Sequence, residues 1–163
     1  IKECDWSSDV CSYDLSAGLD PTLGLDKHFY DRASSTGRRV VGLETAASQI
    51  DRFDQLPIAT QEQMLRSALE EMDTEKENLR GLVAAWKTGD AAALERLLLA
   101  AFGSNPAAYE SLIVERNRNW MPRLDACLAH DESCFVVVGA AHLVGPQGLL
   151  VLLRQRGYRV EQQ

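Results

Sequence analysis

A glycine followed three residues later by a histidine, Gly139 and His142, stands in the apolar segment "VVVGAAHLVGPQG". Imidazole titrates near neutral pH, so such a histidine can hold or transfer a proton during a reaction. A carboxylate, Glu44, directly follows a second apolar run in "RRVVGLET". Carboxylates perform the same proton chemistry. These two residues are therefore the first candidates for a functional site.

The elements that precede these residues explain why they belong together. Residues 39–43 and 134–138 are short valine-rich runs, and both are predicted strands. A strand that is apolar at consecutive positions is buried on both faces, as in parallel sheets. Ligands collect at the carboxyl ends of parallel strands. If the two strands are parallel, Glu44 and His142 share one edge of the sheet.

The sequence predicts an α/β fold: a partial, mostly parallel sheet with a C-terminal βαβ unit and a large helical insertion. Strand 134–138, a helix after "GPQG" and a final strand in "GYRVEQQ" make up the βαβ unit, with a right-handed crossover. Helical periodicity predicts the insertion over residues 45–130. Three of its helices have capping residues at their predicted starts: Thr60, Asp90 and Asn105.

Less specific interpretations compete with a functional site. Gly139 could only turn the chain, with His142 capping the next helix, and Glu44 could be a surface or helix-capping carboxylate. A dinucleotide site is a further alternative for the glycine-containing segment. Its fingerprint, G-x-G-x-x-G, lets the backbone approach a pyrophosphate. Ala141 and His142 occupy the critical positions here, which argues against such a site.

Composition and charge exclude some classes of function. The net charge is −7, and residues 1–15 contribute one lysine against four acidic residues, which leaves −4 for residues 16–163. Nucleic acid is not an expected partner, because phosphate binding needs a clustered basic face. No apolar run reaches the length of a transmembrane helix, so no membrane span is predicted in this chain.

Cys127 and Cys134 flank a predicted turn. A disulfide between them is one interpretation, and two ordinary buried thiols are the favoured one. No neighbouring histidine or second cysteine pair gives them the spacing of a zinc site.

The first residues look unlike evolved protein sequence. "DWSSDVCSYDL" resembles the translation of a high-throughput sequencing adapter, and only Tyr13 departs from it. One base change explains that difference. We therefore predict that residues 1–15 are a non-native, adapter-derived segment and that residues 16–163 are the C-terminal part of a domain whose authentic N-terminus is missing.

Several motifs together resemble the TraB/PrgY/GumN family, closest to its bacterial GumN-like branch. They are "GLDKHFYDRASSTGRRVVGLET", "AAWKTGD", "VERNRNW" and "FVVVGAAHLVGPQGLLVLLRQRGYRVEQ", and the resemblance covers residues 16–163. It implies a domain related to the Tiki metalloproteases, with a site built from two GxxH motifs, a glutamate and an arginine. It also implies a divalent metal such as Zn, Mn or Co and a peptide or protein substrate.

The family site carries over to this sequence residue by residue. The resemblance makes His142 a metal ligand, Glu44 a second ligand or the general base, and Arg116 the group that stabilises an oxyanion. Because both predicted strands end at one edge of the sheet, we expect these three side chains to converge in one cleft, within about 10 Å, the range over which charged groups couple. The supporting motif residues are Gly139, Asn117 and Gly145.

One part of the family site has no counterpart in this sequence. The first GxxH motif is expected upstream of residue 16, and "GLDKH" is spaced GxxxH. A hydrolytic metal site takes about three protein ligands and an open position. We therefore expect this chain to bind Zn, Mn or Co weakly and to hydrolyse no peptide, and its exposed sheet edge to favour self-association. A non-catalytic module that binds a partner in the same cleft is the alternative, and a location in the bacterial envelope rests on the resemblance alone.

Overall fold

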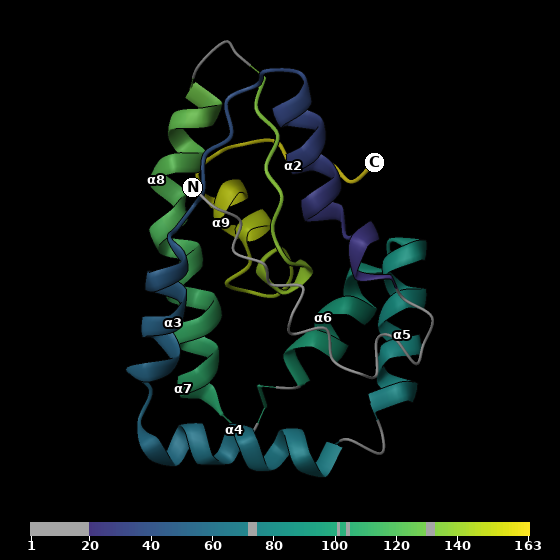
Figure 1. The fold of residues 1–163 in the computed structure, drawn as a ribbon, viewed down its shortest axis with the longest axis vertical. Coiled ribbons are helices and arrows are strands. Elements are labelled where there is room, and N and C mark those ends of the chain that lie inside the picture. The colour runs from purple at the N-terminus through teal and green to yellow at the C-terminus, as the bar shows by residue number, and fades with distance from the viewer. Residues whose placement is uncertain (1–19, 72–74, 101, 104, 130–132) are drawn as a thin grey trace. The chain divides into compact units, whose positions relative to one another are not determined.

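Residues 20–71, 75–100, 102–103, 105–129 and 133–163 are described by a computed structural model, and helices dominate them (Figure 1). Two compact units divide the chain, Ile1–Ala46 and Ala47–Gln163. The elements are η2 (Pro21–Leu23), α2 (Leu25–Ser35), α3 (Ala46–Asp54), α4 (Ile58–Glu71), α5 (Glu75–Thr88), α6 (Ala91–Ala100), α7 (Pro106–Tyr109), η3 (Glu110–Val114), α8 (Glu115–Ala129), η4 (Ala140–His142) and α9 (Leu149–Gln155).

The first unit contains η2 and α2, and these two elements carry local polar contacts. The Asp20 carboxylate accepts hydrogen bonds from the Thr22 hydroxyl and, at 2.9 Å, from the Thr22 backbone N–H. These bonds hold the pKa of Asp20 below its usual value. Helix α2 carries an exposed ion pair between Lys27 and Asp31 at 2.9 Å and has no buried residue. Packing among the described residues of this unit therefore contributes little to a hydrophobic core.

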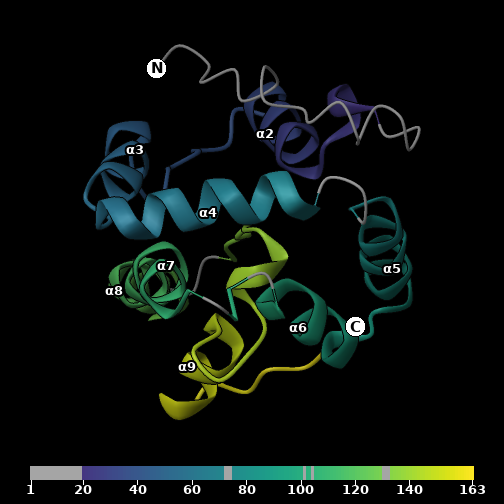
Figure 2. The ribbon, with the colours of Figure 1, turned by 90° about the horizontal axis from the view of Figure 1, so that it is seen from below.

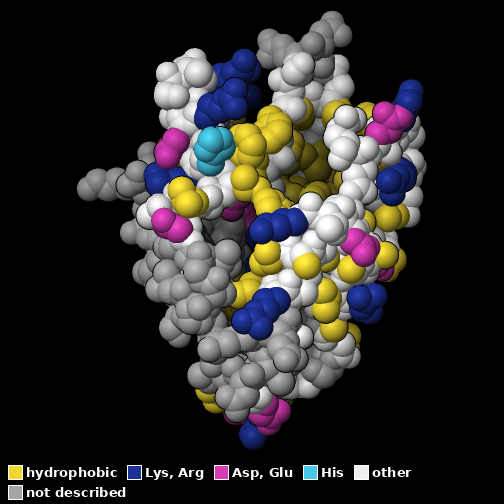
Figure 3. Space-filling view, turned by 90° about the vertical axis from the view of Figure 1, so that its right-hand side faces the viewer, with side chains coloured by type: hydrophobic (Ala, Val, Ile, Leu, Met, Phe, Trp, Pro, Cys, Tyr) yellow, Lys and Arg dark blue, Asp and Glu magenta, His cyan; other side chains and the backbone are white. Residues whose placement is uncertain are grey.

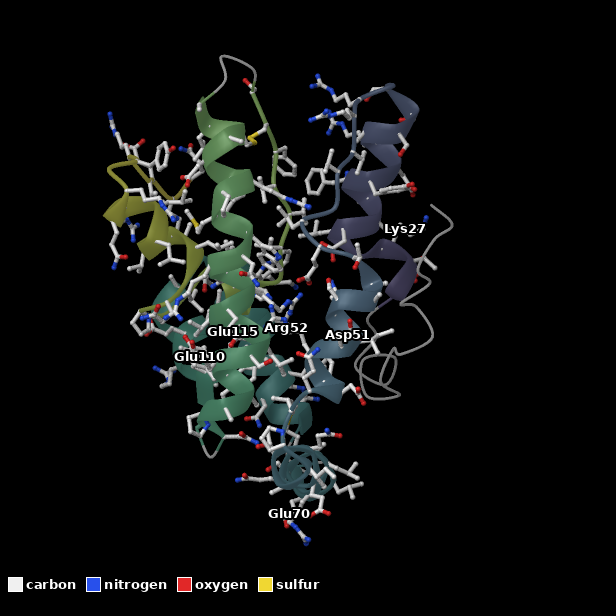
Figure 4. All side chains as sticks on the ribbon, turned by 90° about the vertical axis from the view of Figure 1, so that its left-hand side faces the viewer. Lys27, Asp51, Arg52, Glu70, Glu110 and Glu115 are labelled. Carbon is white, nitrogen blue, oxygen red and sulfur yellow. A yellow bond between two sulfur atoms is a disulfide. The ribbon has the colours of Figure 1, made fainter. Side chains whose placement is uncertain are left out.

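The second unit contains α4 to α9 and nearly all of α3, and it holds the buried side chains. Helix α5 packs against α6, and α6 packs against η4. Figure 2 shows α7 and α8 end-on, with α9 beside them. Arg52 of α3 forms an ion pair with Glu115 of α8, and both are labelled in Figure 4. The buried apolar residues are Leu56, Ala85, Ala108, Leu112, Ile113, Val114, Trp120, Met121, Leu124, Val144 and Leu149.

Two of the three predicted helix caps are confirmed. The Asp90 carboxylate accepts from Ala93 N–H at 2.9 Å at the start of α6, and the Asn105 side chain accepts from Ala108 N–H at 3.2 Å at the start of α7. The prediction for Thr60 is wrong. Helix α4 begins at Ile58, because the Pro57 carbonyl already accepts from Thr60 N–H at 2.8 Å, one turn earlier than the predicted cap.

The predicted α/β fold class is wrong. The described residues contain helices and no strand or sheet. Segments 39–43 and 133–138 are extended or bent chain that belongs to no sheet, and so is the C-terminal run 158–163. A strand apolar on both faces needs neighbours that bury it. Instead, Val41 is 60% exposed and Phe135 is 71% exposed.

Because the described residues form no sheet, the roles of the helices and of the exposed apolar side chains differ from those expected. Helices over residues 46–129 are the body of the second unit rather than an insertion into a sheet. Self-association through a sheet edge has no structural basis in the part of the chain that is described. Figure 3 shows a face on which hydrophobic side chains reach the surface among Lys and Arg side chains.

Candidate functional site

One continuous run of helix, called here the helical column, carries two of the polar residues of the candidate site. It consists of α7, the π turn η3 and α8, and it starts at the Asn105 cap. In the π turn, the Glu115 N–H bonds to the Glu110 carbonyl, five residues back. A π turn widens a helix locally and is frequent near functional sites. The column's buried face contains Ile113, Asn117, Met121 and Leu124, which recur at helical spacing.

Asn117 is the most deeply buried polar residue of this face, with an exposed fraction of 0%. Its side-chain oxygen lies 2.7 Å from Nδ1 of His142. Its side-chain nitrogen donates to the His142 carbonyl at 3.2 Å and to the Gln147 carbonyl at 2.9 Å. One amide thus holds both the backbone and the ring of His142 and the loop that follows. The predicted GxxH histidine is 6% exposed.

This hydrogen-bond pattern assigns the tautomer of His142. Both N–H groups of the Asn117 amide donate to backbone carbonyls, which fixes the orientation of the amide. Its oxygen, which has no hydrogen and can only accept, therefore faces Nδ1 of His142. Nδ1 of His142 must therefore donate, which makes it Nδ1–H. In the neutral ring the lone pair then lies on Nε2. A histidine oriented in this way through Nδ1–H is typical of metal ligands and of catalytic bases.

Trp120 connects His142 with Arg116. The rings of Trp120 and His142 lie 4.5 Å apart between centroids, tilted by 49°. The Arg116 guanidinium lies 5.0 Å from the Trp120 ring centroid, within cation–π range, and donates to the Leu112 carbonyl at 3.0 Å. Two of the three predicted catalytic residues, Arg116 and His142, therefore contact the same indole ring.

The loop after His142 depends on two glycines. Gly145 has φ +83°, a left-handed conformation that favours glycine. A Cβ on Gly148 would lie 2.5 Å from the Val144 carbonyl oxygen and 2.8 Å from the Leu143 carbonyl carbon. Gly139 is less constrained: its φ is −60°, and a Cβ there would meet its nearest neighbour, His142 Cδ2, at 3.9 Å. The loop can thus bring the Gln147 carbonyl to Asn117 only with glycine at position 148.

Tyr109 lies beside this loop. Its hydroxyl is buried, has no hydrogen-bond partner among the described residues, and would lie 3.7 Å from a Cβ built on Gly145. Burial raises the pKa of Tyr109 above 10.0, and the carboxylates of Glu95 and Glu110 raise it further. The phenol therefore stays neutral over the pH range in which proteins work.

Glu44 occupies the bend that precedes α3 and is half-buried. It belongs to the first unit, whereas Arg116, Asn117 and His142 belong to the second. The convergence of Glu44 with Arg116 and His142 in one cleft stays a prediction.

The described residues contain no group of three or more His, Cys, Asp or Glu side chains that could hold a metal ion. The donor chemistry of His142 fits a divalent ion in kind, because Nε2 carries the lone pair, but the donor set falls short of the usual three ligands in number. No helix in the described part of the chain is long and apolar enough to cross a bilayer.

Sequence reasoning missed several residues of this arrangement. Trp120 lies three residues after Asn117 and four after Arg116, which places all three on neighbouring positions of one helix, but this spacing alone does not reveal its contact with His142. Gly148 carried no signal, because its constraint comes from the carbonyls of its own loop. Cys127 and Cys134, interpreted as buried thiols, form a disulfide, and Cys134 is exposed.

In the comparison with protein families, the TraB/PrgY/gumN family model matches residues 10–162. The match overlaps residues 10–15 of the segment predicted to be adapter-derived, and that segment lies outside the described residues. Comparisons with curated proteins and with solved structures gave no match.

Proposed function

Because the chain belongs to the TraB/PrgY/gumN family, we propose that it carries part of the site of a metal-dependent hydrolase acting on peptides, with His142 as its central residue. The observation that supports this is the hydrogen bond of 2.7 Å between Asn117 and His142. It holds the ring by Nδ1–H and leaves the lone pair on Nε2. The divalent metal would activate a water molecule when bound.

The chain's own residues have distinct roles in this proposal. Asn117 selects the tautomer and orientation of His142, which presents Nε2 as a ligand or proton acceptor. Glu44 is the second ligand or the general base. Arg116 supplies positive charge that stabilises an oxyanion. The sequence has a single GxxH motif, so we expect weak metal binding and no peptide hydrolysis by this chain alone.

A second candidate is a non-catalytic module that binds a peptide or protein partner in the same cleft. The contacts of Arg116 favour it, because its guanidinium is already held by the Leu112 carbonyl and the Trp120 ring. An arginine used in this way positions its neighbours rather than meeting a substrate. Both candidates need an oriented His142, and they differ in whether metal binds there.

The test measures the His142 ring directly. Long-range proton–nitrogen NMR on the labelled protein, assigned with His142→Ala, should show the Nδ1–H tautomer, and added Zn²⁺ should shift the Nε2 resonance. Asn117→Ala should mix the tautomers and lower the affinity for Zn²⁺ by about tenfold or more. Arg118→Ala, at the next position on α8, is the matched control and should change neither.

Peptide assays then separate the two candidates. Titrations with Zn²⁺, Mn²⁺ and Co²⁺ and turnover of a peptide library are run on wild type, Glu44→Ala and His142→Ala. Metal binding that His142→Ala abolishes supports the hydrolase proposal. Metal binding that is absent, or equal in His142→Ala, overturns it. Peptide binding that requires His142 but no metal favours the binding module.

A further inference from the structure

A disulfide joins α8 to the segment that leads into the candidate site. Cys127 lies near the end of α8 and Cys134 near the start of segment 133–138, with their Cα atoms 6.2 Å apart. Cys134 is exposed and Cys127 is half-buried. The disulfide is the yellow bond beside α8 in Figure 4. Solvent can therefore reach the bond from the Cys134 side.

The segment is anchored at both of its ends. At one end is the disulfide. At the other end, the His142 N–H bonds to the Gly139 carbonyl at 2.9 Å, and Asn117 holds His142. Because Asn117 and Cys127 are ten residues apart on α8, the segment runs back along that helix, as Figure 1 shows. The stretch between the two anchors forms neither helix nor strand.

An apolar cavity of about 260 Å³ lies beneath this segment, and both cysteines line it. Its walls come from α8, the segment itself and α9. They include Leu124, Leu128, Val136, Val138, Leu149 and Leu153. Val136 is 40% exposed and Phe135 is 71% exposed, so the segment covers the cavity incompletely. A segment with so little buried surface opens at low free-energy cost unless it is cross-linked.

We propose that Cys127–Cys134 is a site of thiol–disulfide exchange with an external dithiol, and that reduction releases segment 133–138 from α8 and opens the apolar cavity. In the oxidised state the bond holds the segment over the cavity. In the reduced state the segment keeps its anchor at Gly139 and His142 and moves about that end. This inference is independent of the proposed hydrolysis.

The exchange proceeds in two balanced steps. A thiolate of the dithiol attacks the accessible sulfur of Cys134, the bond between the two cysteines breaks, and its electron pair and a proton go to Cys127. The second thiolate of the reductant then attacks its own sulfur in the mixed disulfide and releases Cys134 as a thiol. Two electrons and two protons pass from the dithiol to the protein, and the dithiol becomes a disulfide.

The experiment uses the full chain with Cys4→Ser and Cys11→Ser, so that every thiol counted comes from Cys127 or Cys134. Dithiothreitol is the dithiol, and iodoacetamide labelling with mass spectrometry counts and maps the thiols. We expect none before reduction and two after it. Fluorescence of the apolar dye 8-anilinonaphthalene-1-sulfonate, which binds exposed hydrophobic surface, should rise at least about twofold on reduction, because the cavity lined by both cysteines opens. The far-ultraviolet circular dichroism should stay the same.

Two variants are the matched controls. Cys127→Ser and Cys134→Ser should each show the higher dye fluorescence without dithiothreitol and no further change with it. The proposal is overturned if the air-oxidised protein has two free thiols at these positions, or if reduction leaves the dye fluorescence unchanged. All of these readouts are independent of metal and of peptide turnover, so they stand whether or not the chain belongs to a hydrolase.

Discussion

Asn117 is the residue on which the candidate site depends most. Asn117→Ala removes three hydrogen bonds and leaves the carbonyls of His142 and Gln147 without their donor in a buried place. Such losses cost about 1–3 kcal/mol for each buried group left unpaired. We expect the free energy of unfolding to fall by about 2–4 kcal/mol, measured by urea unfolding followed by tryptophan fluorescence.

The control for this prediction is the neighbouring arginine. Arg118 is 55% exposed and pairs with Glu110 at 2.9 Å. Exposed ion pairs contribute about 0–1 kcal/mol, so Arg118→Ala should change stability by less than about 1 kcal/mol. Equal losses in the two variants would contradict the central place given to Asn117.

Gly139 and Gly148 flank His142 in the sequence, and replacing each of them by alanine should change the stability by very different amounts. Gly148→Ala brings a Cβ against the Val144 carbonyl, and backbone cannot yield as a flexible side chain can, so we expect a loss of about 1–3 kcal/mol. Gly139→Ala should cost less than about 1 kcal/mol, because its Cβ finds an ordinary contact distance. Thermal melts of both variants measure the difference. A Gly148→Ala variant as stable as wild type would contradict the close approach of the Val144 carbonyl to position 148.

Tyr109→Phe tests the buried hydroxyl and its pH dependence. A tyrosine hydroxyl in the unfolded chain ionises near pH 10, whereas the raised pKa of Tyr109 keeps its hydroxyl protonated to higher pH in the folded chain. The stability that this contributes is present below about pH 10 and is lost as the pH rises through the folded pKa. The variant should therefore lose less stability than wild type between pH 7 and pH 11.

At pH 7 the same variant should be as stable as wild type or up to about 1 kcal/mol more stable, because the hydroxyl has no partner among the described residues. Urea unfolding at both pH values measures the effect. Tyr30→Phe, at a 48% exposed position of α2, is the control and should follow wild type throughout. A Tyr109→Phe curve parallel to that of wild type would contradict the assignment.

At the scale of elements, the start of the helical column is a sensitive point. Asn105 is 6% exposed, caps α7 and also donates to the Thr60 carbonyl of α4 at 3.3 Å. Asn105→Ala thus removes a cap and a contact between helices, and we expect a loss of about 1.5–2.5 kcal/mol. Asp90→Ala removes only the exposed cap of α6, so it should cost about 1 kcal/mol or less in the same denaturant assay. The reverse order would argue against the contact between α4 and α7.

At the scale of the whole molecule, the buried side chains among the described residues belong to the second unit. A chain of residues 47–163 should therefore keep a cooperative melt within about 5 °C of the full chain, because hydrophobic burial is the dominant favourable term in folding. Its far-ultraviolet circular dichroism should remain helical. A chain that is unfolded at 25 °C would show that residues 1–46 are needed for the core.

Local signals in the sequence determined much of this protein. The caps at Asp90 and Asn105 could be predicted, as could the helix between them, because each depends on residues only a few positions apart. The GxxH motif that contains His142 could be found in the same way. Membership of the family could also be predicted, since motifs spread over the whole chain carry it.

Tertiary structure decided the rest, because the outcome depends on which distant groups become neighbours. Valine-rich runs at 39–43 and 134–138 predicted strands, yet a strand exists only with a partner that completes its hydrogen bonds. The sequence favoured two buried thiols at Cys127 and Cys134, whereas the tertiary structure places their Cα atoms 6.2 Å apart and joins them in a disulfide. The tautomer of His142 likewise follows from Asn117, a residue 25 positions away whose three hydrogen bonds exist only once α8 and the loop are packed together.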